Sequence, residues 1–176
     1  VGRHEERKGL RVLLEAMQEI DRDVDVWVAG DGPETEELRR RFGHDTRIEW
    51  LGRISDEERN RRLAGASVFC VPSQGGESFG VILLEGMAAG VPVVASSIEG
   101  YAAVAGRRDG EPEAAVLVEP GDVAAMAEGI ESVLRDDSRA AALRTAGDAR
   151  AESFSMGRLA EIYEDIYDSI ALTVGS

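Results

Sequence analysis

Two glutamates, Glu77 and Glu85, are spaced so that they could share one ligand. Glu77 is followed by Ser78, Phe79 and Gly80, and an apolar run leads on to Glu85. If a helix begins near Phe79, its free backbone N–H groups and the positive end of its dipole would hold an anion beside Glu77. Glu85 would lie about two turns further along the same helix. The segment therefore predicts a site for a phosphorylated sugar.

A second candidate for phosphate chemistry is Lys8, the single lysine among 20 basic residues. It directly precedes Gly9, where the backbone could approach a ligand closely. An ammonium group is a compact point charge suited to phosphate. Position alone also allows a lysine that simply faces solvent.

Composition narrows the class of protein. The chain has 176 residues, 43% of them hydrophobic and 5% aromatic, which predicts one domain or two very small ones with an aliphatic core. A net charge of -14 argues against a general nucleic-acid-binding surface. Cys70 is the only cysteine, so an internal disulfide is excluded and a reducing, cytoplasmic compartment is expected. No apolar run is long enough to span a membrane, and no signal peptide is expected.

The elements that must position these residues alternate along the chain. We expect a parallel sheet with helices on both faces, because apolar runs alternate with helical patterns. In such sheets ligands bind beyond the carboxyl ends of the strands, here residues 52–56 and 72–77. The expected strands are 24–29, 47–51, 67–71, 91–95 and 115–118, and the expected helices are 34–42, 55–63, 79–89, one from about 99, 123–134, 138–150 and one from 155 onward.

The motifs together resemble the donor-nucleotide half of retaining glycosyltransferases of the family 4 type, which have the two-domain GT-B fold. The sequence is further similar to phosphatidylinositol mannosyltransferases around residues 7–9, 70–72 and 75–80. The resemblance implies an α/β, Rossmann-like donor-binding domain over residues 1–155. It also implies a C-terminal helix, 156–176, that packs toward an N-terminal acceptor domain. The stretches that carry it are residues 1–3, 8–9, 28–33, 50–52, 71–73, 77–80, 85–90, 92–96 and 120–122.

The resemblance implies catalytic roles for Arg3, Lys8 and Glu77. Arg3 and Lys8 would neutralise the donor diphosphate, which gains negative charge as the glycosidic bond breaks. Glu77 would contact hydroxyls of the transferred sugar and stabilise positive charge at its anomeric carbon, without acting as a nucleophile. The alternative for Glu77 is a glutamate that only complements the helix dipole.

Donor-binding roles fall on further residues. Ser78, Phe79 and Gly80 would supply backbone N–H groups to the phosphates, and Glu85 would bind the ribose hydroxyls as a bidentate acceptor. Alternatively, Glu85 is a surface glutamate.

Three residues could contact the base. Ile54 and Asp56 lie where relatives hold it, and an Asp56 carboxylate would suit guanine, although Asp56 could equally support the start of a helix. Arg7 could stack on the base or face solvent.

Two further features are expected to be structural. The turn Gly30–Pro33 should only join a strand to a helix, and His4 and His44 are expected at the surface.

The function expected is that of the donor half of a metal-independent transferase moving a hexose, with mannose from GDP-mannose favoured and a UDP-sugar as the alternative. A lipid, glycan or small-molecule acceptor would bind through the absent N-terminal domain, and any membrane association would run through that half. No cofactor or metal is expected, and no nucleic acid. Other hypotheses are a non-catalytic nucleotide-sugar-binding module or regulatory subunit, and half of a sugar-nucleotide epimerase.

Overall fold

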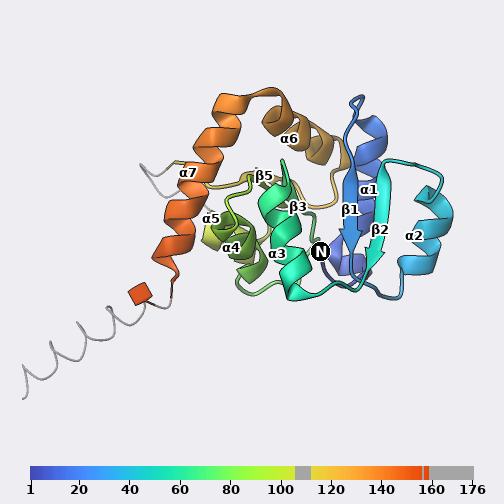
Figure 1. Cartoon of the computed structure of the whole chain (residues 1–176), viewed down its shortest axis with the longest axis horizontal. Helices are drawn as coiled ribbons and strands as arrows, with labels where there is room; N and C mark the ends of the chain where they lie inside the picture. Colours follow the sequence, from blue (N-terminus) through green and yellow to red (C-terminus); the bar gives the residue numbers. More distant parts are fainter. Residues whose placement is uncertain (106–111, 156, 159–176) are drawn as a thin grey trace, which may run out of the picture.

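A computed structural model of the chain describes residues 1–105, 112–155 and 157–158 (Figure 1). The expected α/β class, with parallel strands flanked by helices, is confirmed. The strands are β1 (Val26–Ala29), β2 (Ile48–Gly52), β3 (Phe69–Val71), β4 (Val93–Ser96) and β5 (Val116–Val118). The helices are the short 3₁₀ helix η1 (Glu6–Lys8), α1 (Leu10–Glu19), α2 (Thr35–Phe42), α3 (Asp56–Gly65), α4 (Val81–Ala88), α5 (Glu99–Ala105), α6 (Val123–Arg135) and α7 (Asp137–Ser153).

The strands form two parallel sheets, where the sequence suggested one. β1 pairs with β2, with Val26 opposite Ile48. β4 pairs with β3 on one edge and β5 on the other, with Val94 opposite both Cys70 and Val116. No ladder joins β1 to β3 within the described part of the chain. The two-stranded sheet is too narrow to be stable alone, so helix packing must stabilise it.

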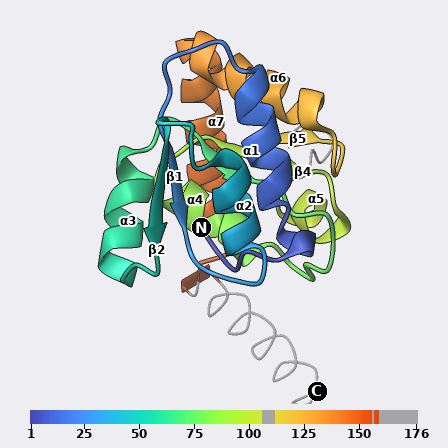
Figure 2. The ribbon, with the colours of Figure 1, turned by 90° about the vertical axis from the view of Figure 1, so that its right-hand side faces the viewer.

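Helices cover both faces of the three-stranded sheet. On one face, Val94 and Val116 pack with α1 and α6 through residues such as Met17 and Met126. On the other face, Val93 packs with residues of α4 and α5. Figure 2 shows α3 on one side of β1 and β2, with α1 and α2 on the other. This layering leaves the carboxyl ends of the strands at one rim.

Local sequence explains several helix starts. The Ser55 hydroxyl accepts a hydrogen bond from the Glu58 N–H at 3.2 Å and caps α3. The Asp122 carboxylate caps α6 in the same way through the Ala125 N–H at 2.9 Å. The expected start of α4 near Phe79 was wrong by two residues. Gly80 has φ +82°, a left-handed conformation that a continuing helix does not allow.

Two further expectations concern the C-terminal helix and membrane-spanning helices. The C-terminal helix expected over 156–176 lies outside the described residues except for Gly157 and Arg158. None of the helices in the described ranges has the length and apolar character needed to cross a bilayer.

Candidate functional site

The candidate site is built where two loops meet, one spanning residues 2–9 and the other 72–80. The Gln74 N–H donates to the Arg7 carbonyl at 2.8 Å, and the Gln74 side chain donates to the Glu6 carbonyl at 3.1 Å. Gly9 has φ +68°, and a β-carbon there would overlap the carbonyl of Pro72. The close approach therefore requires glycine at this position.

Lys8 and Glu77 form an ion pair across this junction, although 69 positions separate them in sequence. The Arg7 guanidinium donates to the same Glu77 oxygen at 3.1 Å. Both partners are only partly exposed, the Lys8 side chain by 28% and the Glu77 side chain by 17%. The fold thus brings three residues that the sequence proposed for one site into direct contact.

The amino end of α4 opens beside Glu77. Within the described residues, the backbone N–H groups of Ser78, Phe79 and Gly80 donate to no acceptor. The Phe79 ring lies edge-on to Phe154 with centroids 5.4 Å apart, which ties the loop to the end of α7. Such unpaired N–H groups at a helix start can receive an anion.

A buried hydrogen bond joins the loop of residues 72–80 to α5. The Ser73 hydroxyl and the Tyr101 phenol are 2.9 Å apart, and both side chains are almost fully buried. Burial raises the pKa of Tyr101, which therefore stays a neutral hydrogen-bonding group. A β-carbon on Gly80 would come within 2.9 Å of the Tyr101 ring, so Tyr101 fixes the backbone path into α4. Neither Ser73 nor Tyr101 was among the site residues expected from the sequence.

Glu85 lies on α4 and faces α3. Its carboxylate is 3.8 Å from the Arg59 guanidinium, which is also 3.5 Å from the Asp56 carboxylate. The Glu85 side chain is 35% exposed, whereas Asp56, the first residue of α3, is 88% exposed. Ile54 is half-buried in the connection between β2 and α3. Arg59 was not proposed from sequence, yet it joins the residues expected to hold ribose and base.

Arg3 stands apart from the Lys8–Glu77 pair. Its side chain is 71% exposed, and among the described residues its guanidinium reaches only the Glu5 carboxylate, at 4.0 Å. The other Glu5 oxygen is 2.7 Å from Arg7. Glu5, which was not expected at the site from the sequence, therefore links Arg3 indirectly to the cluster around Glu77.

The expectation that His4 lies at the surface was wrong, because only 4% of it is exposed. Its Nδ1 is 2.8 Å from the Thr35 hydroxyl, and its ring packs edge-on against Trp50. The Asp31 carboxylate accepts from the Gly32 N–H and from Thr35. His4 thus anchors the first loop to the turn Gly30–Pro33, whose contacts join it to α2.

Among the described residues lie two cavities, and the smaller one adjoins the candidate site. A cavity of about 360 Å³ lies between the two sheets, and a smaller one of about 70 Å³ is lined by Lys8, Ser73 and Tyr101. Across residues 1–105, 112–155 and 157–158, no group of three or more His, Cys, Asp or Glu side chains is placed to hold a metal ion.

Basic side chains lie near the carboxyl ends of the parallel strands, beside the unpaired N–H groups at the amino end of α4. This arrangement is typical of an α/β nucleotide-binding domain. Comparison with known proteins then places the sequence: residues 1–136 match the family described as "Glycosyl transferases group 1". The chain belongs to this family.

One relative is a phosphatidyl-myo-inositol mannosyltransferase of Mycobacterium tuberculosis, 35% identical over 97% of this chain. The alignment covers 46% of that relative, so the chain spans about half its length.

Solved structures confirm the expected half of a GT-B fold. Sucrose-phosphate synthase from Thermosynechococcus elongatus superposes with a TM-score of 0.80 at 28% identity, over 98% of this chain and 45% of that one. Anabaena Alr3699/HepE in complex with UDP gives a TM-score of 0.77 at 22% identity, over 97% of this chain and 48% of that one.

Proposed function

We propose that this chain is the donor-binding half of a retaining, metal-independent hexosyltransferase that uses GDP-mannose. The observation that carries the proposal is the contact of Lys8 with Glu77 beside the open start of α4. A cation, a carboxylate and unpaired N–H groups are the groups needed for a diphosphate joined to a sugar. Mannose is favoured because the mannosyltransferase relative matches nearly the whole chain.

In this proposal different residues bind different parts of the donor. Lys8 and the N–H groups of Ser78, Phe79 and Gly80 bind the diphosphate, while Glu77 accepts from sugar hydroxyls. Lys8 therefore exchanges part of its contact with Glu77 for a phosphate oxygen when the donor binds. Arg3 adds a second cation. Within the part of the chain that the structure describes, its side chain contacts only Glu5, at 4.0 Å, so turning toward the phosphates would break no strong contact there.

Glu85 receives the ribose hydroxyls in this arrangement, and Arg59 holds its carboxylate in place. Ile54 and Asp56 contact the base, whereas Arg7, which donates to Glu77 at 3.1 Å, stays at the sugar end of the donor. The exposed Asp56 carboxylate can accept from the N–H groups of guanine, but it also sits in the first turn of α3, where an acidic residue favours the helix.

The chemical step needs little from the protein beyond positioning and charge. The acceptor hydroxyl attacks the anomeric carbon on the face from which the nucleoside diphosphate departs. Its proton passes to the leaving phosphate oxygen as the new glycosidic bond forms. Lys8 and Arg3 stabilise the negative charge that develops on that phosphate, and Glu77 stabilises the positive charge on the sugar ring. The acceptor, whether lipid, glycan or small molecule, binds through the other half of the full-length protein, which would also carry any attachment to the inner face of the cytoplasmic membrane.

A UDP-sugar donor is the second candidate, because the Anabaena neighbour was solved with UDP. A nucleotide-sugar-binding module without turnover is the third, because Lys8, Glu77 and the open start of α4 would bind a donor whether or not transfer follows.

Titration of the chain with GDP, UDP and ADP, together with transfer assays on the full-length protein, separates these candidates. We expect GDP to bind most tightly and GDP-mannose to be the donor consumed. Selective UDP binding would favour the second candidate. Donor binding without transfer to any acceptor would favour the third.

A further inference from the structure

Five charged side chains of the two loops form one continuous chain of ion pairs, in which cations and carboxylates alternate. The order is Arg3, Glu5, Arg7, Glu77 and Lys8. The first three N–O contacts measure 4.0 Å, 2.7 Å and 3.1 Å, and the last two residues are in direct contact. Four of the five already have a role in the proposed function, as ligands of the phosphates or the sugar, whereas Glu5 has none.

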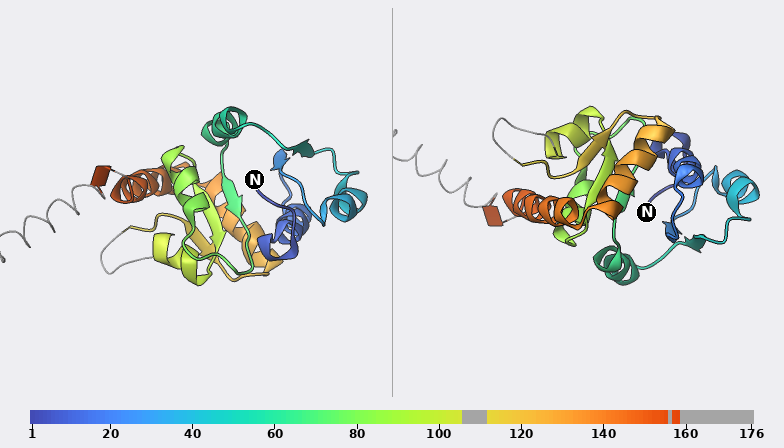
Figure 3. Two further views of the ribbon diagram at one scale, coloured as in Figure 1. Left: turned by 90° about the horizontal axis from the view of Figure 1, so that it is seen from below. Right: turned by 90° about the horizontal axis from the view of Figure 1, so that it is seen from above.

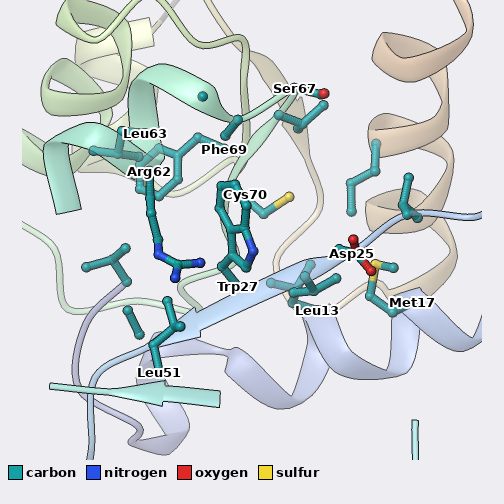
Figure 4. Close-up of a pocket in the computed structure, with 18 of the residues that line it drawn as sticks. Leu13, Met17, Asp25, Trp27, Leu51, Arg62, Leu63, Ser67, Phe69 and Cys70 are labelled. Atoms are coloured by element: carbon teal, nitrogen blue, oxygen red, sulfur yellow. The ribbon is translucent and has the colours of Figure 1, made fainter. Parts of the chain in front are cut away.

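This chain of ion pairs lies at the rim of the molecule and not in the larger cavity. Figure 3 shows the amino terminus between the two sheets, from where residues 2–9 lead on. The larger cavity is bordered mainly by apolar side chains such as Leu13 and Met17 (Figure 4), and none of the five charged residues lines it. Arg3 and Lys8 instead line the smaller cavity of about 70 Å³. An anion bound there would therefore lie beside the ion pairs.

The local structure gives the Glu5 carboxylate little to do. Glu5 precedes η1 in an extended conformation, with φ -133° and ψ 151°, but its side chain makes no capping hydrogen bond. The side chain is 23% exposed, and its shielded Oε1 accepts no hydrogen bond within the described residues, although Arg7 is 2.7 Å away. Charge rather than hydrogen-bond geometry thus holds the pair, and partly exposed ion pairs contribute little to stability. Glu5 is therefore a partly shielded negative charge whose contacts do little for the fold.

The balance of charge at the cluster indicates a role for Glu5. Three cations and two carboxylates leave one net positive charge, and without Glu5 the cluster would carry two. A nucleoside diphosphate carries roughly three negative charges near neutral pH, because its terminal phosphate titrates near pH 6. A nucleoside-diphosphate sugar carries about two, since the sugar blocks that second ionisation. A carboxylate beside the phosphates therefore opposes the product more than the donor.

We propose that Glu5 is a built-in competitor of the diphosphate. In the empty site it neutralises Arg7 and, more weakly, Arg3. When the donor binds, Arg3 leaves Glu5 for the phosphates, and Arg7 stays between Glu5 and Glu77. The negative charge of Glu5 then lowers the affinity for the diphosphate and assists release of the product, a step that limits turnover in many enzymes. This role of Glu5 rests on the proposed function, because it requires a diphosphate beside Lys8.

Calorimetric titration of wild type and Glu5→Gln with GDP and with guanosine tests the proposal. The substitution keeps the size of the side chain and removes its charge. We expect the affinity for GDP to rise by about five- to tenfold and the affinity for guanosine to stay the same. A residue that only holds the loop in place would give the opposite sign, because a disturbed loop binds GDP more weakly. The gain should shrink as salt is raised from about 0.05 M to about 1 M, since salt screens the repulsion.

Two further variants serve as controls. Glu6→Gln removes the same charge at the next residue, where the side chain is exposed, and should change the affinity for GDP by less than about twofold. Glu5→Asp keeps the negative charge at the cluster, so its affinity for GDP should stay close to that of wild type.

Several results would overturn the proposal. An affinity for GDP that is equal or lower in Glu5→Gln would mean that Glu5 only holds Arg3 and Arg7 in place. An equal gain for guanosine would show that the phosphates are not what Glu5 opposes, and an equal gain in Glu6→Gln would assign the effect to overall charge. Absence of GDP binding in wild type would instead contradict the proposed donor. Inorganic pyrophosphate, which lacks base and sugar, then tests the same variants for competition by Glu5.

Discussion

Gly9 lies directly against the carbonyl of Pro72, so closely that a β-carbon on Gly9 would overlap it. This contact joins the loop that carries Lys8 to the loop that carries Glu77. Replacing Gly9 with alanine should separate the loops, because both the left-handed φ of +68° and the overlap oppose a side chain.

We expect Gly9→Ala to lower the free energy of unfolding by about 2–4 kcal/mol in urea denaturation. Gly65→Ala is the control. Gly65 ends α3 with open space around it, so that substitution should be neutral or slightly stabilising. Equal effects of the two substitutions would contradict the proposed role of the contact.

A second prediction concerns the entry to α4. Gly80→Ala combines a φ of +82° with a β-carbon 2.9 Å from the Tyr101 ring, whereas Gly90→Ala has a similar φ of +72° and open space. Gly90→Ala should therefore cost only the backbone strain of about 1 kcal/mol, and Gly80→Ala should cost more. Because Gly80 sets the direction of the free N–H groups, its substitution should also weaken GDP binding, measured by calorimetry. Unchanged GDP affinity in Gly80→Ala would argue against a phosphate site there.

A third prediction follows from the position of Glu85 near Arg59. If Glu85 binds ribose, Glu85→Ala should weaken the binding of guanosine and the binding of GDP by the same factor, roughly tenfold each. The pair is partly exposed, so unfolding free energy should change by less than about 1 kcal/mol. Glu57→Ala, at an exposed position on α3, should change neither affinity. A loss confined to GDP would place Glu85 near the phosphates instead.

A fourth prediction concerns the buried His4. Burial lowers its pKa from the ordinary 6.5, and the amino terminus and Arg39 act in the same direction, while the backbone carbonyl of Ala29 and Asp31 oppose it. The unfolded chain thus takes up this proton at a higher pH than the folded chain does. Stability that His4 contributes at neutral pH should therefore decline as pH falls below about 6.5.

Urea denaturation between neutral pH and about pH 5 checks this expectation. We expect His4→Gln to flatten the decline, because the titrating group is gone. His44→Gln, which alters an exposed histidine, should leave the decline in place. An identical pH dependence in wild type and His4→Gln would show that His4 does not titrate differently on folding.

Much of the fold could be predicted from local sequence. The strands were expected from apolar runs, three of which end at Gly30, Gly52 or Pro72, and all five are present within two residues of the expected bounds. The start of α3 was read from the Ser55 cap, and the turn Gly30–Pro33 is structural as expected. Such features depend on residues that are adjacent in sequence, so they can be predicted without a structure.

One error at a helix start had a local signal that was not used, and another had none. Helix α1 was missed, although Leu10, Leu13, Leu14 and Met17 follow helical spacing directly after Gly9. The start of α4 was placed too early, because the sequence does not show that Gly80 adopts a left-handed conformation.

Other features depend on residues far apart in the chain. The contact of Lys8 with Glu77, the hydrogen bond between Ser73 and Tyr101 and the position of Arg59 beside Glu85 all join separate elements. No local pattern encodes such pairs. The division into two sheets is also non-local, because it depends on which strand edges find a partner.

The most direct test of the proposed donor site is calorimetric titration of wild type and Lys8→Ala with GDP and with guanosine. We predict that Lys8→Ala lowers the affinity for GDP by about tenfold or more, which is at least about 1.4 kcal/mol of binding free energy. The affinity for guanosine should not change, because only the diphosphate binds the ammonium group. Arg40→Ala, which removes the same charge from the exposed face of α2, should leave both affinities as in wild type. GDP affinity that is equal in wild type and Lys8→Ala would contradict the assignment of Lys8 to the donor phosphates.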